Sequence, residues 1–303
     1  MDGIINILKP PEMTSFDVVS ALRGILKTKK IGHTGTLDPM VSGVLPVCIG
    51  KATKAVELLI EKGKTYRCEI TLGVTTDTQD SFGKILEIKK VNVSKKKIAE
   101  DIMSFEGQYN QIPPMYSAKK INGKKLYQLA RAGLEIERES VSVTIKRIGI
   151  IEFFGDDKVL FDVECTKGTF IRSLCEDIGI KLGTGAHMSF LLRTQSGSFN
   201  IHDTVTIQQV AESMKNGIVN DILIPTDTIF KDYPKIILDQ NQMLKYKNGM
   251  TTVLMNCYGT DEGFLAIDKS LMRVYELHTD LFIGLGEISI GNEIVYIKTK
   301  KFF

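Results

Sequence analysis

The chain has 303 residues and a net charge of only +3, so its overall charge gives weak support for a nucleic-acid partner. Apolar residues make up 43% of it and charged residues 25%, as in an ordinary globular protein with a sizeable core. No apolar run is long enough to cross a bilayer and no secretory pattern opens the chain, which excludes a membrane or secreted protein and predicts the cytoplasm. The five cysteines lack paired spacing, which favours buried reduced thiols over a disulfide framework or a zinc site.

Apolar periodicity predicts helices and strands along most of the chain. In chain order we expect a helix capped by Ser15, a strand over residues 44–49, a helix over 52–61, a strand over 65–72, helices over 94–105 and 124–132, strands over 141–154 and 159–165, and helices over 170–182 and 205–216. The tract from Ile224 to Pro234 predicts a domain boundary. Short strands with Gly and Asn turns beyond it predict a compact β-rich module.

One glycine-rich loop concentrates the chemistry of the sequence. It reads Gly-His-Thr-Gly-Thr-Leu-Asp-Pro over residues 32–39 and contains one carboxylate, Asp38, among hydroxyls and His33. Its glycines permit backbone angles closed to other residues, and Pro39 keeps Asp38 out of the α region. Such a loop either presents a catalytic nucleophile or is an Asp-Pro turn whose carboxylate caps backbone amides.

The segment from Tyr116 to Arg147 is basic. It holds eight Lys or Arg residues against three Glu, a local excess of five that is larger than the net charge of the whole chain. Tyr116 and Tyr127 lie among these charges. The segment is therefore either a phosphate-contacting surface for a nucleic acid or a solvated lysine face.

Motifs of several other enzyme classes are absent from the sequence. There is no G-x-x-x-x-G-K-[ST] phosphate loop, no G-x-G-x-x-G, no G-x-S-x-G and no H-E-x-x-H. Most cofactor-dependent and hydrolase functions are excluded on this ground, and we expect neither a cofactor nor a metal. Only His33 of the four histidines lies in a motif, so we expect the others to be packing or surface residues.

The glycine-rich loop belongs to a longer segment, residues 30–54, that closely resembles the catalytic motif of the TruB family, the bacterial tRNA pseudouridine-55 synthases. Other segments match this family in the same order along the chain. They are residues 3–17, 64–66, 111–119, 167–174 and 191–197. The resemblance is strong over residues 3–200 and holds only in outline beyond them.

The resemblance implies an α+β pseudouridine synthase fold with a mixed, largely antiparallel sheet, followed by a small β-rich PUA-type domain. We therefore expect a catalytic domain over residues 1–230 and a PUA-like RNA-binding domain over 231–303. Residues 116–139 resemble an RNA-gripping insertion of the family. Lys119 and Lys124 are its candidate phosphate contacts.

The resemblance also implies roles for individual residues. Asp38 matches the catalytic aspartate, and Arg172 matches an arginine that pairs with this carboxylate and orients it. Tyr66 matches an active-site tyrosine that stacks on the extruded base and helps to remove its C5 proton. The alternatives are a surface arginine that opens a helix and an ordinary aromatic residue in a strand.

Further matches concern the pocket and its surroundings. Lys9 and His33 match positions that support the loop and the flipped-out nucleotide, and Leu191 matches a leucine in the pocket floor. Phe170 stands where relatives often have tyrosine, so an aromatic wall remains without its hydroxyl. Leu192 replaces a frequent arginine, which leaves Arg193 as the candidate RNA contact.

The reaction implied is the isomerisation of the T-loop uridine at position 55 of tRNA. It breaks the N1–C1′ bond, turns the base and joins C5 to C1′, so it needs neither a redox cofactor nor ATP. A carboxylate is ionised at neutral pH, and it is suited to attack C1′ or to stabilise the charge that develops there. The sequence leaves open whether Asp38 adds to the sugar carbon or removes a sugar proton.

The expected partner is the T stem-loop of tRNA, whose stacked target base must be extruded to react. We expect a monomer that has no obligatory protein partner and does not bind a membrane. Two alternatives stay open from the sequence. One is a guide-RNA-dependent pseudouridine synthase with the same catalytic core, and the other is a catalytically idle protein that binds or folds RNA.

Overall fold

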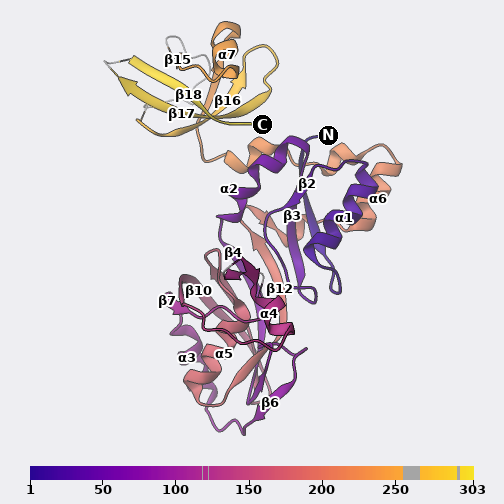
Figure 1. Ribbon diagram of the computed structural model, residues 1–303, viewed down its shortest axis with the longest axis vertical. Helices are drawn as coiled ribbons and strands as arrows, with labels where there is room; N and C mark the ends of the chain where they lie inside the picture. The colour runs from indigo at the N-terminus through magenta and orange to yellow at the C-terminus, as the bar shows by residue number, and fades with distance from the viewer. Residues whose placement is uncertain (118, 122, 255–266, 292–293) are drawn as a thin grey trace.

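The computed structural model describes residues 1–303 except 118, 122, 255–266 and 292–293 (Figure 1). Among the described residues one large sheet has the order β1-β3-β12-β4-β11-β10-β7, with β2 beside β3 and β13 beside β12. Its strands are β1 (Gly3–Lys9), β2 (Ile31–His33), β3 (Ser42–Ile49), β4 (Lys64–Leu72), β7 (Gly107–Gln111), β10 (Val141–Phe154), β11 (Lys158–Cys165), β12 (Ala186–Ser196) and β13 (Phe199–Asn200). The β3 and β12 strands pair in parallel and the other neighbours are antiparallel, so the sheet is mixed and largely antiparallel, as predicted.

Helices cover different parts of this sheet. They are α1 (Ser15–Leu26), α2 (Val56–Ile60), α3 (Lys95–Met103), α4 (Leu126–Arg131), α5 (Ile171–Leu182) and α6 (Ile207–Lys215), with 3-10 turns η1 (Gly50–Ala55), η2 (Ile201–Asp203), η3 (Val219–Ile222) and η4 (Thr226–Phe230). Figure 1 shows α1 and α6 beside β2 and β3, and α3 and α5 beside β4, β10 and β12. The N-terminal part of the chain, residues 1–230, is thus one sheet with two helical layers over different regions.

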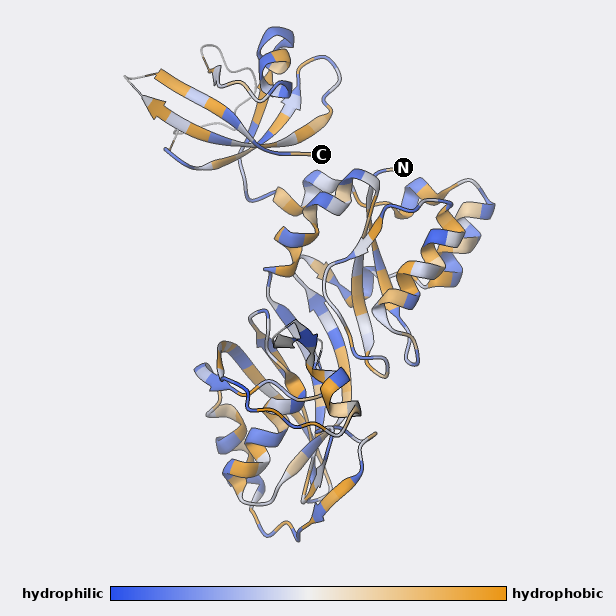
Figure 2. Ribbon diagram, in the orientation of Figure 1, coloured by the Kyte–Doolittle hydropathy of each residue, from blue (hydrophilic) through white to orange (hydrophobic). Residues whose placement is uncertain are grey.

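Alternating burial explains how the strands form. In β11, Val159, Phe161, Val163 and Cys165 are buried while the residues between them face outward. These buried side chains belong to a cluster that also contains residues of α3 and α5, and a second cluster joins α1 and α6 to β1 and β3. Figure 2 shows the corresponding hydrophobic residues along β3 and on α1 and α6.

The C-terminal part forms a separate small sheet in the order β14-β16-β17-β18-β15. Its elements are β14 (Lys235–Leu238), α7 (Gln240–Lys247), β15 (Thr252–Val253), β16 (Leu271–Glu276), β17 (Phe282–Gly291) and β18 (Ile294–Phe302). It has its own buried core. Aromatic rings join it to the N-terminal part, because Phe230 of η4 lies 6.0 Å from Phe282 and 5.5 Å from Phe303 between ring centroids.

Two small hairpins extend from the N-terminal part. They are β5 (Val74–Thr76) with β6 (Ile85–Ile88), and β8 (Lys120–Ile121) with β9 (Lys124–Lys125). Residues 77–84 form the turn of the first hairpin, and the second lies inside the predicted basic insertion. No helix in the described ranges has the length and apolar character to span a bilayer.

The structure differs from the sequence predictions at several places. Thr14, and not Ser15, caps α1, because its hydroxyl accepts from the Asp17 amide while the Asp17 carboxylate accepts from the Thr14 amide. The predicted helix over 52–61 is half 3-10 turn, and α7 and the long strand β12 were not predicted. The four described cysteines are buried and free, and Cys257 lies outside the described residues.

We predict that Gly43→Ala lowers the free energy of unfolding by about 2 kcal/mol or more. Gly43 has a φ of +122°, and an added Cβ would lie 2.3 Å from the backbone oxygen of Arg193 on the neighbouring strand. Gly24→Ala is the matched control, since Gly24 lies exposed within α1 with nothing near its Cβ. Chemical denaturation should show the control unchanged or stabilised by about 0.5–1 kcal/mol. Equal stability of the two variants would contradict the close packing of β3 on β12.

Candidate active site

The loop between β2 and β3 presents Asp38 on a fixed backbone. Leu37 and Val41, on either side of it, are buried in the core that contains α5. The Leu37 amide donates to the Ser15 hydroxyl at 2.9 Å, and the Val41 amide donates to the Asp38 carbonyl at 3.0 Å. The Asp38 carboxylate itself stays 45% exposed. The apolar anchors therefore hold the loop while its carboxylate faces outward.

Lys9 fastens this loop to the start of α1. Its buried ammonium donates to the carbonyls of Pro10 at 2.7 Å, Met13 at 2.5 Å and Pro39 at 3.0 Å. Burial lowers the pKa of Lys9 to about 8, and the charge of nearby Asp38 opposes this shift. The predicted role of Lys9 in supporting the loop agrees with these contacts, and its side chain has no exposed surface to offer a nucleotide.

Arg193, the predicted RNA contact, lies buried beneath the loop and bonds to its backbone. It is 1% exposed, and its guanidinium donates to the carbonyls of Val44 at 2.7 Å and Gly35 at 3.3 Å. His33 lies nearby, where its Nδ1 accepts from the Gly35 amide at 3.3 Å. Burial and the charge of Arg193 lower the pKa of His33, so the imidazole is neutral at physiological pH.

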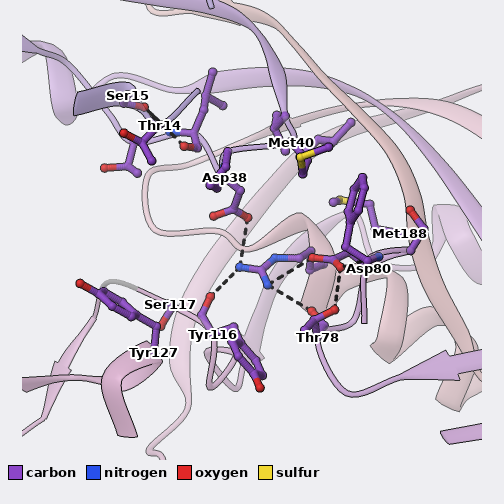
Figure 3. Close-up of a pocket in the computed structure, with 18 of the residues that line it drawn as sticks. Thr14, Ser15, Asp38, Met40, Thr78, Asp80, Tyr116, Ser117, Tyr127 and Met188 are labelled. Carbon is purple, nitrogen blue, oxygen red and sulfur yellow. Dashed lines mark hydrogen bonds and ion pairs between the residues drawn. The ribbon is translucent and has the colours of Figure 1, made fainter. Parts of the chain in front are cut away.

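Arg172, the second residue of α5, pairs with Asp38. Its side chain is 7% exposed, and its Nη2 lies 3.0 Å from the Asp38 carboxylate. The same guanidinium donates to the Tyr116 carbonyl at 2.7 Å and to the Thr78 carbonyl at 3.1 Å, and it lies 3.6 Å from the Asp80 carboxylate. Figure 3 shows these four partners converging on one planar group. A guanidinium fork suits this arrangement because its donors point in fixed directions.

Asp80 lies in the turn of the β5–β6 hairpin and was missed by the sequence analysis. Its carboxylate accepts from the Thr78 hydroxyl at 2.6 Å and from the Phe82 amide at 3.0 Å. The carboxylate is therefore held in place near Arg172. The only signal in the sequence was the run Thr-Thr-Asp-Thr-Gln-Asp after a strand, which is also typical of an ordinary polar turn.

The side chains of Asp38, Asp80 and Arg172 face a cavity of about 870 Å³. Of the predicted site residues, Asp38, Arg172, His33 and Leu191 line this cavity. Residues that were not predicted also line it, among them Asp80, Phe82 and Phe190. Lys9, Tyr66, Phe170, Arg193, Lys119 and Lys124 are not part of its wall. The structure thus brings the proposed carboxylate, its arginine and the pocket leucine together in one site.

Tyr66 lies on β4 opposite Arg193 of β12 and packs against the catalytic core. Burial raises the pKa of its phenol, the Arg193 guanidinium opposes this shift, and the charge of Asp38 adds to it. The phenol therefore stays neutral at physiological pH and is close enough to feel the charge of Asp38. Tyr66 is not among the residues that line the cavity.

The other predicted contacts lie around the site. Phe170 precedes α5, and the Gln111 side chain accepts from its amide at 2.8 Å and donates to its carbonyl at 3.0 Å. This pair of bonds fixes the start of the helix that carries Arg172. Lys119 is half-buried and Lys124 is exposed, both on the segment that follows Tyr116.

The charges of the cavity wall favour a cationic reacting centre. The wall contains the carboxylates of Asp38 and Asp80 and one guanidinium, that of Arg172, while its histidine is neutral. Its net charge is therefore negative, which stabilises positive charge developing on a bound sugar and disfavours a phosphate there. Across the described residues, no three His, Cys, Asp or Glu side chains gather to hold a metal ion.

The comparisons with known proteins agree with this site. The N-terminal domain model of the TruB family pseudouridylate synthases matches residues 23–171, and the C-terminal domain model of tRNA pseudouridylate synthase B matches residues 172–231. The tRNA pseudouridine synthase B of Alkaliphilus oremlandii is 53% identical over 82% of this chain and 82% of its own length. That of Clostridioides difficile is 44% identical over 100% of both chains.

Solved structures show the same fold. A structure of an H/ACA RNP bound to a substrate RNA containing 2′-deoxyuridine matches with a TM-score of 0.73 and 27% identity, over 99% of this chain and 84% of that chain. A Cbf5-Nop10-Gar1 complex matches with a TM-score of 0.73 and 28% identity, over the same shares. Fold and site thus define a pseudouridine synthase, which is an isomerase, and the predicted α+β fold is confirmed. The chain belongs to the TruB family of pseudouridylate synthases.

We predict that Arg172→Lys lowers the rate of pseudouridine formation about 100-fold or more, because an ammonium cannot reach all four partners of the guanidinium. Arg67→Lys is the matched control, since Arg67 also pairs with an aspartate, Asp162, at 2.9 Å, but its side chain is 43% exposed and lies outside the cavity wall. Single-turnover assays at saturating RNA should find the control within about twofold of wild type. Similar rates for the two variants would contradict the orienting role of Arg172.

Proposed function

We propose that this enzyme isomerises the T-loop uridine at position 55 of tRNA, with Asp38 as the nucleophile. The observation that carries the proposal is the exposed Asp38 carboxylate, which faces the cavity and is held at 3.0 Å by the buried Arg172. The relatives named tRNA pseudouridine synthase B, which match over most of their length, support tRNA as the substrate.

In this proposal the uridine leaves its stack and enters the cavity with its sugar toward Asp38. Extrusion costs about a few kcal/mol, which apolar contacts in the pocket offset. Asp38 acts at C1′ while the N1–C1′ bond breaks, the freed uracil turns, and C5 joins C1′. A proton leaves C5 and another is taken up by N1, so the product is an isomer of the substrate. Leu191 forms part of the wall against which the base turns.

The RNA outside the cavity requires further contacts. We propose that the exposed Lys124 and the half-buried Lys119 contact phosphates of the T stem, because they lie on the basic segment next to the cavity residue Tyr116. We also propose that residues 231–303 hold the acceptor stem. The aromatic contacts of Phe230 with Phe282 and Phe303 support this, since they fix this part relative to the cavity.

The two alternatives from the sequence are less well supported. The chain shares 27–28% identity with the solved H/ACA RNP and Cbf5-Nop10-Gar1 structures but 42–53% with relatives named tRNA pseudouridine synthase B. This difference favours an enzyme that acts without a guide RNA. A catalytically idle RNA-binding protein would have no need for a carboxylate held by a buried guanidinium at the edge of a cavity.

We predict that Asp38→Asn abolishes pseudouridine formation and leaves tRNA affinity within about threefold of wild type, because the amide keeps the shape of the carboxylate without its charge. Asp162→Asn is the matched control, since Asp162 also pairs with an arginine but lies outside the cavity wall. Pseudouridine should be mapped in unmodified tRNA after incubation with each protein. Substantial product at position 55 from Asp38→Asn would contradict the assignment of the nucleophile.

A further inference from the structure

We propose that Phe82 and Phe190 form a stacking site for a base that flanks the isomerised uridine. This inference rests on the proposed RNA substrate and adds a contact outside the reacting nucleotide. Phe82 is 66% exposed and Phe190 is 47% exposed, yet both line the cavity that contains Asp38. Their rings therefore lie where RNA next to an inserted uridine has to pass.

The backbone around Phe82 is firmly held. Its amide donates to the Asp80 carboxylate at 3.0 Å, and the Asp77 carboxylate accepts from the Lys84 amide at 2.7 Å. Gly83 completes this turn, because an added Cβ would lie 2.4 Å from the Thr78 hydroxyl. The exposed ring thus projects from a rigid turn, so little further ordering is needed when a base binds.

The two phenylalanines lie on neighbouring segments. Asp80 and Met188 form a parallel bridge, and the Ser81 amide donates to the Met188 carbonyl at 3.1 Å. Phe82 and Phe190 each follow this bridge by two residues. A bulge between Met188 and Phe190 interrupts the alternation of β12, which explains how four consecutive residues, Met188 to Leu191, reach the cavity.

A third exposed phenylalanine of the cavity wall, Phe16, already has a partner for its ring. Phe16 is covered by the Arg23 guanidinium at 5.6 Å from its centroid. Within the described ranges, neither Phe82 nor Phe190 contacts an aromatic ring or a cation. Their faces are therefore open to a planar ligand.

An RNA base supplies the planar surface that these rings lack. Extrusion of a uridine removes the stacking partner of the bases on either side of it, so a flanking base gains most from a new aromatic contact. Base–aromatic stacking is tolerant of sequence because every base has a π-face. The site therefore holds the flanking nucleotide in place without requiring a particular base.

The test uses a synthetic T stem-loop RNA and the variants Phe82→Ala, Phe190→Ala and Phe82→Tyr. We expect each alanine variant to bind the RNA about tenfold more weakly and Phe82→Tyr to bind as wild type does, because tyrosine keeps the ring. Single-turnover rates at saturating RNA are measured for the same variants, so that a loss of affinity is separated from a loss of catalysis. Ile85→Ala is the matched control, because Ile85 is 61% exposed on the same hairpin and is not part of the cavity wall.

An abasic nucleotide placed on either side of the target uridine identifies the stacked base. Where the abasic nucleotide replaces the stacked base, RNA binding by wild type should weaken about tenfold. Binding by Phe82→Ala should not weaken further, because this variant has already lost the same base–ring contact. The inference is overturned if the alanine variants bind like Ile85→Ala, or if abasic substitution on either side weakens wild type and variant equally. If wild type modifies a different uridine, only the proposed target is overturned. The abasic nucleotides would then be placed on either side of that uridine.

Discussion

The Arg172 guanidinium is buried between two carboxylates and two backbone carbonyls, and these partners come from three separate loops. Asp38 comes from the loop before β3, Thr78 and Asp80 from the β5–β6 turn, and Tyr116 from the segment after β7. A buried guanidinium is costly unless its donors are satisfied, so each loop is held by the requirement to satisfy the same cation. The guanidinium therefore positions the carboxylate and shapes the cavity together.

Buried polar groups also hold the loop of Asp38 from beneath. Lys9 and Arg193 use backbone carbonyls as acceptors, among them those of Pro39 and Gly35 within the loop. Carbonyls satisfy these cations without adding negative charge near Asp38. The carboxylate thus keeps Arg172 as its closest ionic partner while the loop below it is rigid. Such preorganisation is what a site needs if it is to stabilise charge that appears only during the reaction.

Much of the fold was predictable from the sequence, because alternating apolar residues specify strands such as β11 locally. The bond between Asp38 and Arg172 was expected only from the resemblance, since nothing local brings residues 134 positions apart together. Asp80 and Phe82 were missed because a polar turn with one exposed ring has no distinctive pattern. The burial of Arg193 could not be predicted, since it depends on which strands pair, and the strand β12 that carries it was not predicted.

Arg172 orients Asp38 only while the Asp80 carboxylate holds the guanidinium on its other side. The single-turnover rate of Asp80→Asn tests this dependence most directly. The amide keeps the size of the side chain but removes the charge 3.6 Å from the guanidinium. At saturating tRNA we expect the rate of pseudouridine formation to fall about tenfold or more, with tRNA affinity within about twofold of wild type. A rate equal to that of wild type would contradict the claim, because the guanidinium would then be held sufficiently by its other partners.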